Sequence, residues 1–190
     1  MRWKQTEYSG WGRALRAEGR LARPERTAQL RDLGGLPAVG NLRSYGDTAL
    51  VNEGDAIDMT RMDRLISFNP ETGVLDAEAG ITIGEILRIF APKGWMPAVV
   101  PGTGFATLGG CIANDVHGKN HHNVGSFGQH VESVSLIGID GKPRRVSVKR
   151  EAKVFAATLG GLGQTGIITS ARIQLVRCSG GQMSVSEKRI

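Results

Sequence analysis

The clearest periodic pattern of apolar and polar positions lies in TIGEILRIFAPKG, residues 82–94, and it predicts an amphipathic helix. Thr82 and Glu85 have the spacing of a capping box at its start, and Pro92 and Gly94 end it. The buried face is predicted from the i, i+3, i+4, i+7 spacing of Ile83, Ile86, Leu87 and Phe90.

Short apolar runs predict strands on both sides of this helix. Residues 55–80 read as strands separated by the turn NPETG. Residues 131–148 predict a hairpin around Asp140-Gly141, followed by a helix over 151–163 and a closing strand over 165–176. Strands and helices alternate irregularly, with hairpins among them, so we expect an α+β fold rather than a doubly wound parallel sheet.

The N-terminal part of the chain has weaker patterns. Residues 1–26 are polar and basic with little periodicity, and they predict an arm that packs late or pairs at a sheet edge. Residues 22–33 suggest a helix, with Pro24 near its start and apolar Leu30 and Leu33. Residues 37–47 predict a short strand that runs into a loop.

Composition narrows the class of protein. Hydrophobic residues make up 40% and charged residues 22%, an ordinary soluble balance. The net charge is +6, but basic residues are scattered and aromatic residues make up only 5%, so we expect no nucleic-acid partner. We find neither an apolar signal region nor a run of membrane-spanning length. Cys111 and Cys178 fit no metal or redox spacing, which favours the cytoplasm, with or without contact to a membrane surface.

The stretch HGKNHHNVGSFG, residues 117–128, holds three of the four histidines. His117 and His121 would share a face of a helix, as metal ligands can. Three glycines argue against a helix, and only Asp115 could add a nearby ligand, so we predict no metal site. Two interpretations remain: a loop whose histidines cap backbone groups, and a loop moulded around a planar cofactor.

Glycine is abundant, with 27 residues that cluster in short stretches. Each stretch can direct several backbone N–H groups at one point, which suits a pyrophosphate. None has the G-x-G-x-x-G spacing or the ending of a P-loop, so the pattern indicates nucleotide or flavin binding without a Rossmann motif. The stretches are GNLRSYGD (40–47), PGTG (101–104), TLGG (107–110) and GGLGQTG (160–166).

In this order, RSYGD, PGT with TLGG, HGKNHH with GSFG, and GGLGQTGII resemble the flavin-binding domain of the vanillyl-alcohol-oxidase-like FAD oxidoreductases. SGWGR (9–13) further resembles those members that oxidise the ribose 2′-hydroxyl of a polyprenyl-phosphate sugar. The resemblance covers residues 9–176 and implies a two-lobed, PCMH-type FAD-binding domain, with the substrate-binding domain absent from these 190 residues. The implied parts are an N-terminal arm (1–20), a first lobe (21–100), a second lobe (101–178) and the start of a linker (179–190).

The resemblance also implies roles for single residues. Tyr45 and His117 would line the flavin and substrate face, and Lys119 would lie near the sugar phosphate, which makes these three the implied catalytic residues. A neutral imidazole can polarise a hydroxyl, and a lysine suits a phosphate. The implied FAD contacts are Gly40, Asn41, Leu42, Arg43, Ser44, Tyr45, Gly46 and Asp47 in a first loop, and Gly102, Thr107, Leu108, Gly109, Gly110, Asn114, His117 and Ile167 beyond it.

Two positions depart from the family pattern. Leu42 stands where many relatives have glycine, and its branched side chain is expected to crowd the loop or alter its φ. Asp47 stands where covalently flavinylated relatives have histidine, so we expect FAD to be non-covalent. We also expect Gly109→Val to abolish flavin binding while the fold is retained.

The implied reaction is hydride transfer from a sugar CH–OH group to flavin N5. The implied partners are a polyprenyl-phosphate sugar as substrate and a reductase that completes an epimerisation. The alternative is a truncated or split FAD-binding module that has no turnover on its own.

Overall fold

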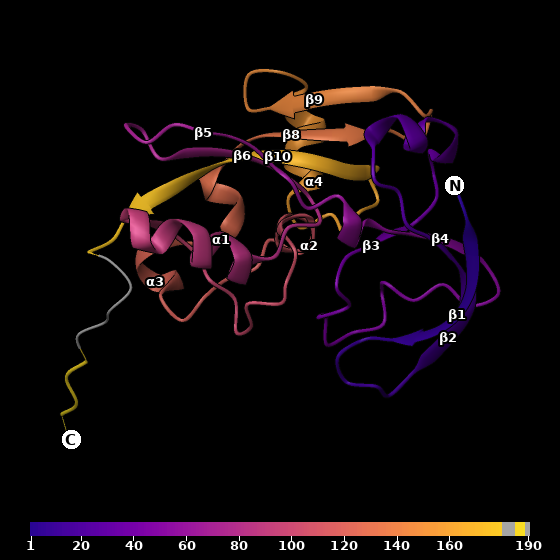
Figure 1. Ribbon diagram of the computed structural model, residues 1–190, viewed down its shortest axis with the longest axis horizontal. Coiled ribbons are helices and arrows are strands. Elements are labelled where there is room, and N and C mark those ends of the chain that lie inside the picture. Colours follow the sequence, from indigo (N-terminus) through magenta and orange to yellow (C-terminus); the bar gives the residue numbers. More distant parts are fainter. Residues whose placement is uncertain (180–184, 189–190) are drawn as a thin grey trace.

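The computed structural model describes residues 1–179 and 185–188, which form two β-sheets and four short α-helices (Figure 1). The smaller sheet has the strand order β1-β2-β4-β3, and the larger has the order β5-β6-β10-β8-β9, with β7 also paired to β10. The predicted α+β class is confirmed. The strands are β1 (Trp3–Ser9), β2 (Arg16–Ala22), β3 (Ala38–Val39), β4 (Asp55–Asp58), β5 (Leu65–Phe68), β6 (Val74–Glu78), β7 (Trp95–Pro97), β8 (Val131–Ile137), β9 (Pro143–Ser147) and β10 (Ile167–Arg177).

The helices lie below the larger sheet in Figure 1. The central strand β10 pairs antiparallel with β6, β7 and β8. Its Ala171, Ile173 and Leu175 are buried, while Arg172 between them is exposed, because successive side chains of a strand point to opposite faces. The helices are α1 (Ile83–Phe90), α2 (Leu108–Ala113), α3 (His121–Val124) and α4 (Ala152–Thr158), with 3₁₀ turns at Thr27–Leu33, Met59–Arg61, Ala91–Lys93 and Phe127–His130.

Helix α1 confirms the amphipathic pattern. Thr82 Oγ1 accepts a hydrogen bond of 3.2 Å from the Glu85 N–H, as an N-cap does. The Glu85 carboxylate pairs with Arg88 instead of closing the capping box. Ile83, Ile86 and Phe90 are buried in the main core. The hairpin β8–β9 and the NPETG turn between β5 and β6 are likewise confirmed.

Residues 3–22 of the N-terminal arm pair at a sheet edge, which was one of the two expectations for them: they form the hairpin β1–β2 at the edge of the smaller sheet, and β2 runs parallel to β4. Buried and exposed positions do alternate in β2, but the buried ones are Ala17, Gly19 and Ala22. Small residues give little hydrophobic signal, so the alternation was not evident from the sequence. The predicted helix over residues 22–33 is only a 3₁₀ turn.

A second apolar cluster joins the two sheets. It lies where β4 and the turn after it meet the ends of β8 and β10, and every member is at most 4% exposed. The chain passes from the smaller sheet to the larger one between Asp58 and Leu65, whereas the predicted lobe boundary is at residue 100. The division into two FAD-binding lobes stays a prediction. In the described parts of the chain, no helix has both the length and the apolar character needed to cross a membrane. The cluster consists of Leu30, Ile57, Met59, Met62, Ile137 and Ile167.

We predict that Glu78→Gln lowers the free energy of unfolding by about 2 kcal/mol. Glu78 is only 6% exposed, and its carboxylate accepts hydrogen bonds from the Arg64 N–H at 3.0 Å and from Arg64 Nη2 at 2.6 Å. The measurement is urea denaturation. Glu85→Gln is the matched control, since the Glu85–Arg88 pair is exposed and should leave the unfolding midpoint unchanged. Equal midpoints for both variants would contradict the expectation.

Candidate functional site

The loop 41–47 has a row of backbone N–H groups available to a ligand. Within the described part of the chain, none of these seven N–H groups donates a hydrogen bond to a protein acceptor. The residues are half-buried or exposed. Leu42 has a φ of +52°, so the loop keeps a left-handed residue although the side chain is leucine. The sequence suggested that Leu42 crowds the loop or alters its φ; with the left-handed φ kept, we expect its effect to be backbone strain.

This loop is fixed against the segment that precedes α2. A Cβ on Gly40 would overlap Thr107 Oγ1, so only glycine allows this approach. The Asn41 side chain donates a 3.0 Å hydrogen bond to the Phe105 carbonyl. The sequence-predicted loops around residues 40 and 104 are therefore neighbours in space.

The TLGG stretch is not a loop, because Thr107 caps helix α2 and the next residues belong to that helix. The Gly109 N–H donates to the Ala79 carbonyl at 2.8 Å, and the Gly110 N–H donates to Thr107 Oγ1 at 3.2 Å. These two N–H groups are already used within the protein. The Leu108 N–H likewise donates to the Ile81 carbonyl at 2.8 Å, so these three N–H groups of the anion nest predicted at residues 107–110 are not available to an anion.

The predicted site glycines fall into two groups. A Cβ on Gly109 would lie 2.9 Å from the Ala79 Cβ, so Gly109 is required by packing. The structure therefore leads us to expect that Gly109→Val disturbs the fold, in contrast to the expectation from the sequence. By contrast, a Cβ on Gly102 would meet nothing within 4 Å, and one on Gly46 would meet only Thr48 Oγ1, at 3.8 Å. Gly102 and Gly46 face open space where a ligand can lie.

The histidine-rich stretch is attached to the same region. Asn120 Nδ2 donates a 3.0 Å hydrogen bond to the Ala98 carbonyl. Gly118 packs so closely on Val100 that a Cβ would lie 2.7 Å from the Val100 carbonyl oxygen. The base of the stretch is held by Asp115, whose carboxylate accepts hydrogen bonds from Ser126 Oγ at 2.8 Å and from the Gly128 N–H at 2.7 Å.

The stretch does contain a helix, contrary to the sequence analysis. Helix α3 begins at His121 and makes a single turn, which ends at Gly125 with a φ of +73°. His117 lies before it, in a β-bridge with Ser126, yet its ring centroid is only 5.3 Å from that of His121. Among the described residues, no group of three or more potential ligands is placed to hold a metal ion.

One of the two interpretations of this stretch was that its histidines cap backbone groups, and His130, just after the stretch, has such a role. His130 Nε2 lies 2.9 Å from the Val124 carbonyl oxygen, so His130 satisfies a backbone group. His121 and His122 are exposed, and within residues 1–179 and 185–188 neither makes a hydrogen bond through its side chain. Their predicted capping role is wrong, because α3 turns both rings to the surface.

The GGLGQTG stretch also meets α2. The Gly160 N–H donates to the Ile112 carbonyl at 3.0 Å, and the Leu162 N–H donates to the Ala113 carbonyl at 2.8 Å. Helix α2 is thus the element on which the glycine-rich stretches converge. Ile167, which follows them, is 1% exposed in the cluster between the sheets, so its side chain does not face a surface ligand.

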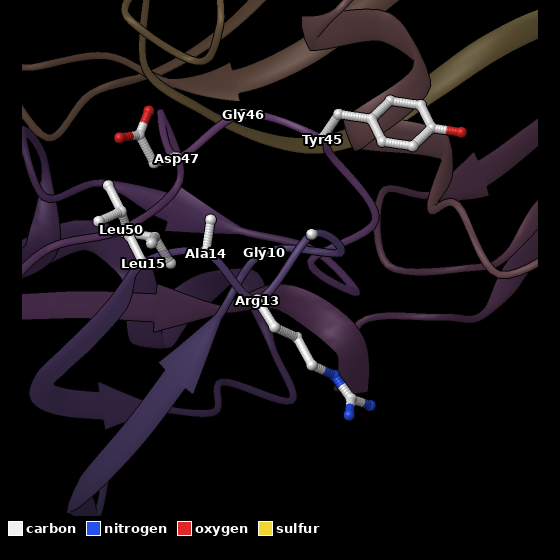
Figure 2. A pocket seen from close by; sticks show the side chains of 9 residues that line it. Gly10, Arg13, Ala14, Leu15, Tyr45, Gly46, Asp47 and Leu50 are labelled. Atoms are coloured by element: carbon white, nitrogen blue, oxygen red, sulfur yellow. The ribbon is translucent and has the colours of Figure 1, made fainter.

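The three implied catalytic residues are all accessible. Tyr45 is 87% exposed, and His117 and Lys119 are exposed as well. Figure 2 shows that the Tyr45 ring extends away from Asp47 and Leu50. The catalytic roles of Tyr45, His117 and Lys119 stay predictions.

A feature that sequence reasoning missed lies beside the first loop. The tip of the β1–β2 hairpin packs on residues 44–46: the Trp11 N–H donates to the Ser44 carbonyl at 3.0 Å. A pocket of about 260 Å³ lies here, and its lining includes Arg13 and Leu15 of the hairpin tip and Tyr45 and Asp47 of the loop (Figure 2). Its volume is below the roughly 300–1,000 Å³ of small-molecule sites, so a dinucleotide needs the wider surface of the loops. The motif SGWGR was the only available signal.

Residues 15–147 match the family described as the FAD binding domain. The chain belongs to this family. The resemblance noted from the motifs is thereby confirmed, and FAD is the cofactor of this FAD-binding domain. The hairpin tip lies just before the matched residues.

Several curated relatives are similar in sequence to this chain. Decaprenylphosphoryl-beta-D-ribose oxidase from Mycolicibacterium smegmatis is 42% identical over 143 residues, which cover 74% of this chain and 31% of the relative. D-2-hydroxyglutarate dehydrogenase from Escherichia coli is 33% identical over 124 residues, or 64% of this chain and 12% of the relative. Cytokinin dehydrogenase 2 from Arabidopsis thaliana is 30% identical over 140 residues, or 74% and 28%. The chain therefore matches less than a third of the length of each.

The residues of this FAD-binding domain fit the cofactor. The N–H groups of the loop 41–47 and the open space at Gly102 would suit a glycine cradle for a pyrophosphate, which needs close backbone approach. Cys111 is fully buried beneath this surface, and burial raises the pKa of its thiol to about 12. Asn114 uses its side chain to donate to the Gly110 carbonyl at 2.8 Å, so it supports α2.

We predict opposite outcomes for valine at Gly102 and Gly109. Gly102→Val should keep the melting temperature and weaken FAD binding at least tenfold, since its side chain enters the open cradle. Gly109→Val should lower the melting temperature of the protein without FAD, because it collides with Ala79. Flavin fluorescence titration and thermal denaturation measure the two effects. A destabilised Gly102→Val, or a stable Gly109→Val, would contradict this assignment.

We predict that glycine at residue 42 gives a more stable protein than alanine does, which is the reverse of their order inside a helix. Leu42→Gly should be more stable than Leu42→Ala by about 1 kcal/mol, because only glycine adopts a positive φ without strain. Ala156, which is exposed within α4, provides the control: there, Ala156→Gly should destabilise by about 1 kcal/mol. Urea denaturation decides, and a Leu42→Ala variant at least as stable as Leu42→Gly would show that the loop has another conformation.

Proposed function

We propose that the chain is the FAD-binding part of an oxidoreductase that acts on a sugar CH–OH group. The specific substrate we propose is the ribose 2′-hydroxyl of a polyprenyl-phosphoryl ribose. The observation that carries the proposal is the attachment of the histidine-rich stretch to the segment that leads into the glycine cradle, through Gly118 and Asn120. The 42% identity to an oxidase named for decaprenylphosphoryl ribose supports the choice of sugar.

The chain's own residues would divide the work. Bound FAD supplies the acceptor for the hydride. Backbone N–H groups of residues 41–47 hold its pyrophosphate, and the exposed imidazole of His117 takes the proton of the sugar hydroxyl. Lys119, two residues further on, provides a positive charge for the phosphate of the lipid.

The proposed activity belongs to the whole protein, because this chain corresponds to 31% of the length of the named oxidase. On its own, the chain should bind FAD without oxidising sugar. A polyprenyl-phosphate substrate would bring the protein to a membrane surface, and a reductase that acts on the resulting ketone would complete an epimerisation.

The test is anaerobic reduction of the flavin in the full-length protein by polyprenyl-phosphoryl ribose, followed as loss of flavin absorbance. The 2′-deoxy analogue is the matched control, since it lacks the group to be oxidised. Bleaching by the ribose compound alone supports the proposal. Bleaching by 2-hydroxy acids instead would favour the chemistry named for the Escherichia coli relative.

We predict that His117→Ala lowers turnover of the full-length enzyme by about 10² while FAD stays bound, since general base catalysis typically contributes 10²–10⁴. His122→Ala serves as the control and should keep full activity, because His122 lies on the exposed side of α3. Steady-state kinetics and the flavin absorbance of the purified variants provide the readouts. Unchanged turnover of His117→Ala would remove this histidine from the reaction.

A further inference from the structure

The guanidinium of Arg43 has an unusual setting in the first loop. Its Nε donates a 2.6 Å hydrogen bond to the Asn41 carbonyl, inside the same loop. Among residues 1–179 and 185–188, no carboxylate forms an ion pair with it, although ten other ion pairs are present. The N–H groups on both terminal nitrogens of Arg43 therefore stay available to a ligand, as do the backbone N–H groups of residues 41–47.

Trp11 lies against this arginine from outside the loop. The Arg43 Cζ is 5.1 Å from the centroid of the Trp11 ring, within the range of a cation–π interaction. Trp11 also donates its backbone N–H to the Ser44 carbonyl at 3.0 Å. The first contact holds the side chain of Arg43, and the second holds the backbone of Ser44.

The hairpin that carries Trp11 is itself firmly placed. A Cβ on Gly10 would lie 3.0 Å from the Gly46 carbonyl oxygen, so the tip packs directly on the loop. At the base of the tip, the buried Tyr8 hydroxyl accepts a 3.0 Å hydrogen bond from the Val51 N–H and donates a 3.1 Å one to the Val51 carbonyl. Tip and loop therefore form one packed unit.

We propose that Trp11 is a positioning residue for FAD binding, which acts through Arg43. The hairpin tip braces the pyrophosphate loop, and the indole ring holds the guanidinium in a single orientation toward the negative charge of the cofactor. The brace lies before residues 15–147, so it is an addition to the part that matches the family. The inference rests on FAD binding by the first loop.

The hairpin offers a matched control. Trp3, at the far end of β1, makes the same kind of contact with Arg20, whose Cζ lies 5.6 Å from the ring centroid. Arg20 is paired with Asp55 and is not part of the FAD loop. Removal of either tryptophan ring takes one cation–π contact from the hairpin, but only Trp11 touches the loop.

The experiment is a double-mutant cycle on the dissociation constant for FAD, measured by quenching of flavin fluorescence in the 190-residue chain. Trp11→Ala should weaken binding about fivefold, the size of one exposed cation–π contact. Trp3→Ala should leave the constant unchanged, and Trp11→Phe should stay within about twofold. In an Arg43→Ala background, Trp11→Ala should have no further effect.

Each other result overturns the proposal. An equal loss with Trp3→Ala would make the effect a general loss of hairpin stability, which melting temperatures of both variants would also show. An undiminished effect of Trp11→Ala without Arg43 would mean that the indole acts by itself. Absence of FAD binding by the unaltered chain would refute the FAD site and the brace together, whereas normal binding by Trp11→Ala refutes only the brace.

Discussion

The close approach of Gly40 to Thr107 is the constraint on which the candidate site depends. Thr107 is 3% exposed, and its hydroxyl caps α2 by accepting from the Gly110 N–H. The same side chain occupies the space where a Cβ of Gly40 would lie. One buried threonine therefore starts the helix on which the glycine-rich stretches converge and sets the position of the first loop. Any side chain at residue 40 would push the first loop away from Thr107 and the start of α2.

The glycines around this contact serve different physical purposes, which their clustering in the sequence conceals. Gly109 is needed for contact between α2 and Ala79, and Gly118 for contact with Val100. Gly102 and Gly46 meet almost no protein atoms, so they leave room for something else. A glycine-rich motif is thus partly a packing requirement and partly an open surface, and only the three-dimensional structure separates the two.

Much of the fold could be predicted where the hydrophobic signal was strong. The helix α1 and the hairpin β8–β9 were found because their buried positions carry large apolar side chains. The hairpin β1–β2 was missed because the buried positions of β2 are alanine and glycine, and α2 was missed because two glycines stand in its first turn. In both cases tertiary packing overrides weak local propensity.

The candidate site could be predicted as a set of motifs but not as an arrangement. The sequence order of RSYGD, TLGG and HGKNHH says nothing of the Asn41–Phe105 and Asn120–Ala98 hydrogen bonds that hold these segments together. Nor could spacing reveal that α3 brings the His117 and His121 rings to 5.3 Å. Such contacts depend on long-range packing, which local patterns do not encode.

The first loop itself explains why it needs support from both sides. Seven N–H groups make no bond within the described protein, and Leu42 holds a left-handed φ, so the loop has little internal stabilisation. Its conformation must therefore come from its neighbours. Asn41 is tied to Phe105 on one side, and Ser44 is tied to Trp11 on the other. A loop held from outside keeps its own polar groups available, which is the property that a pyrophosphate site requires.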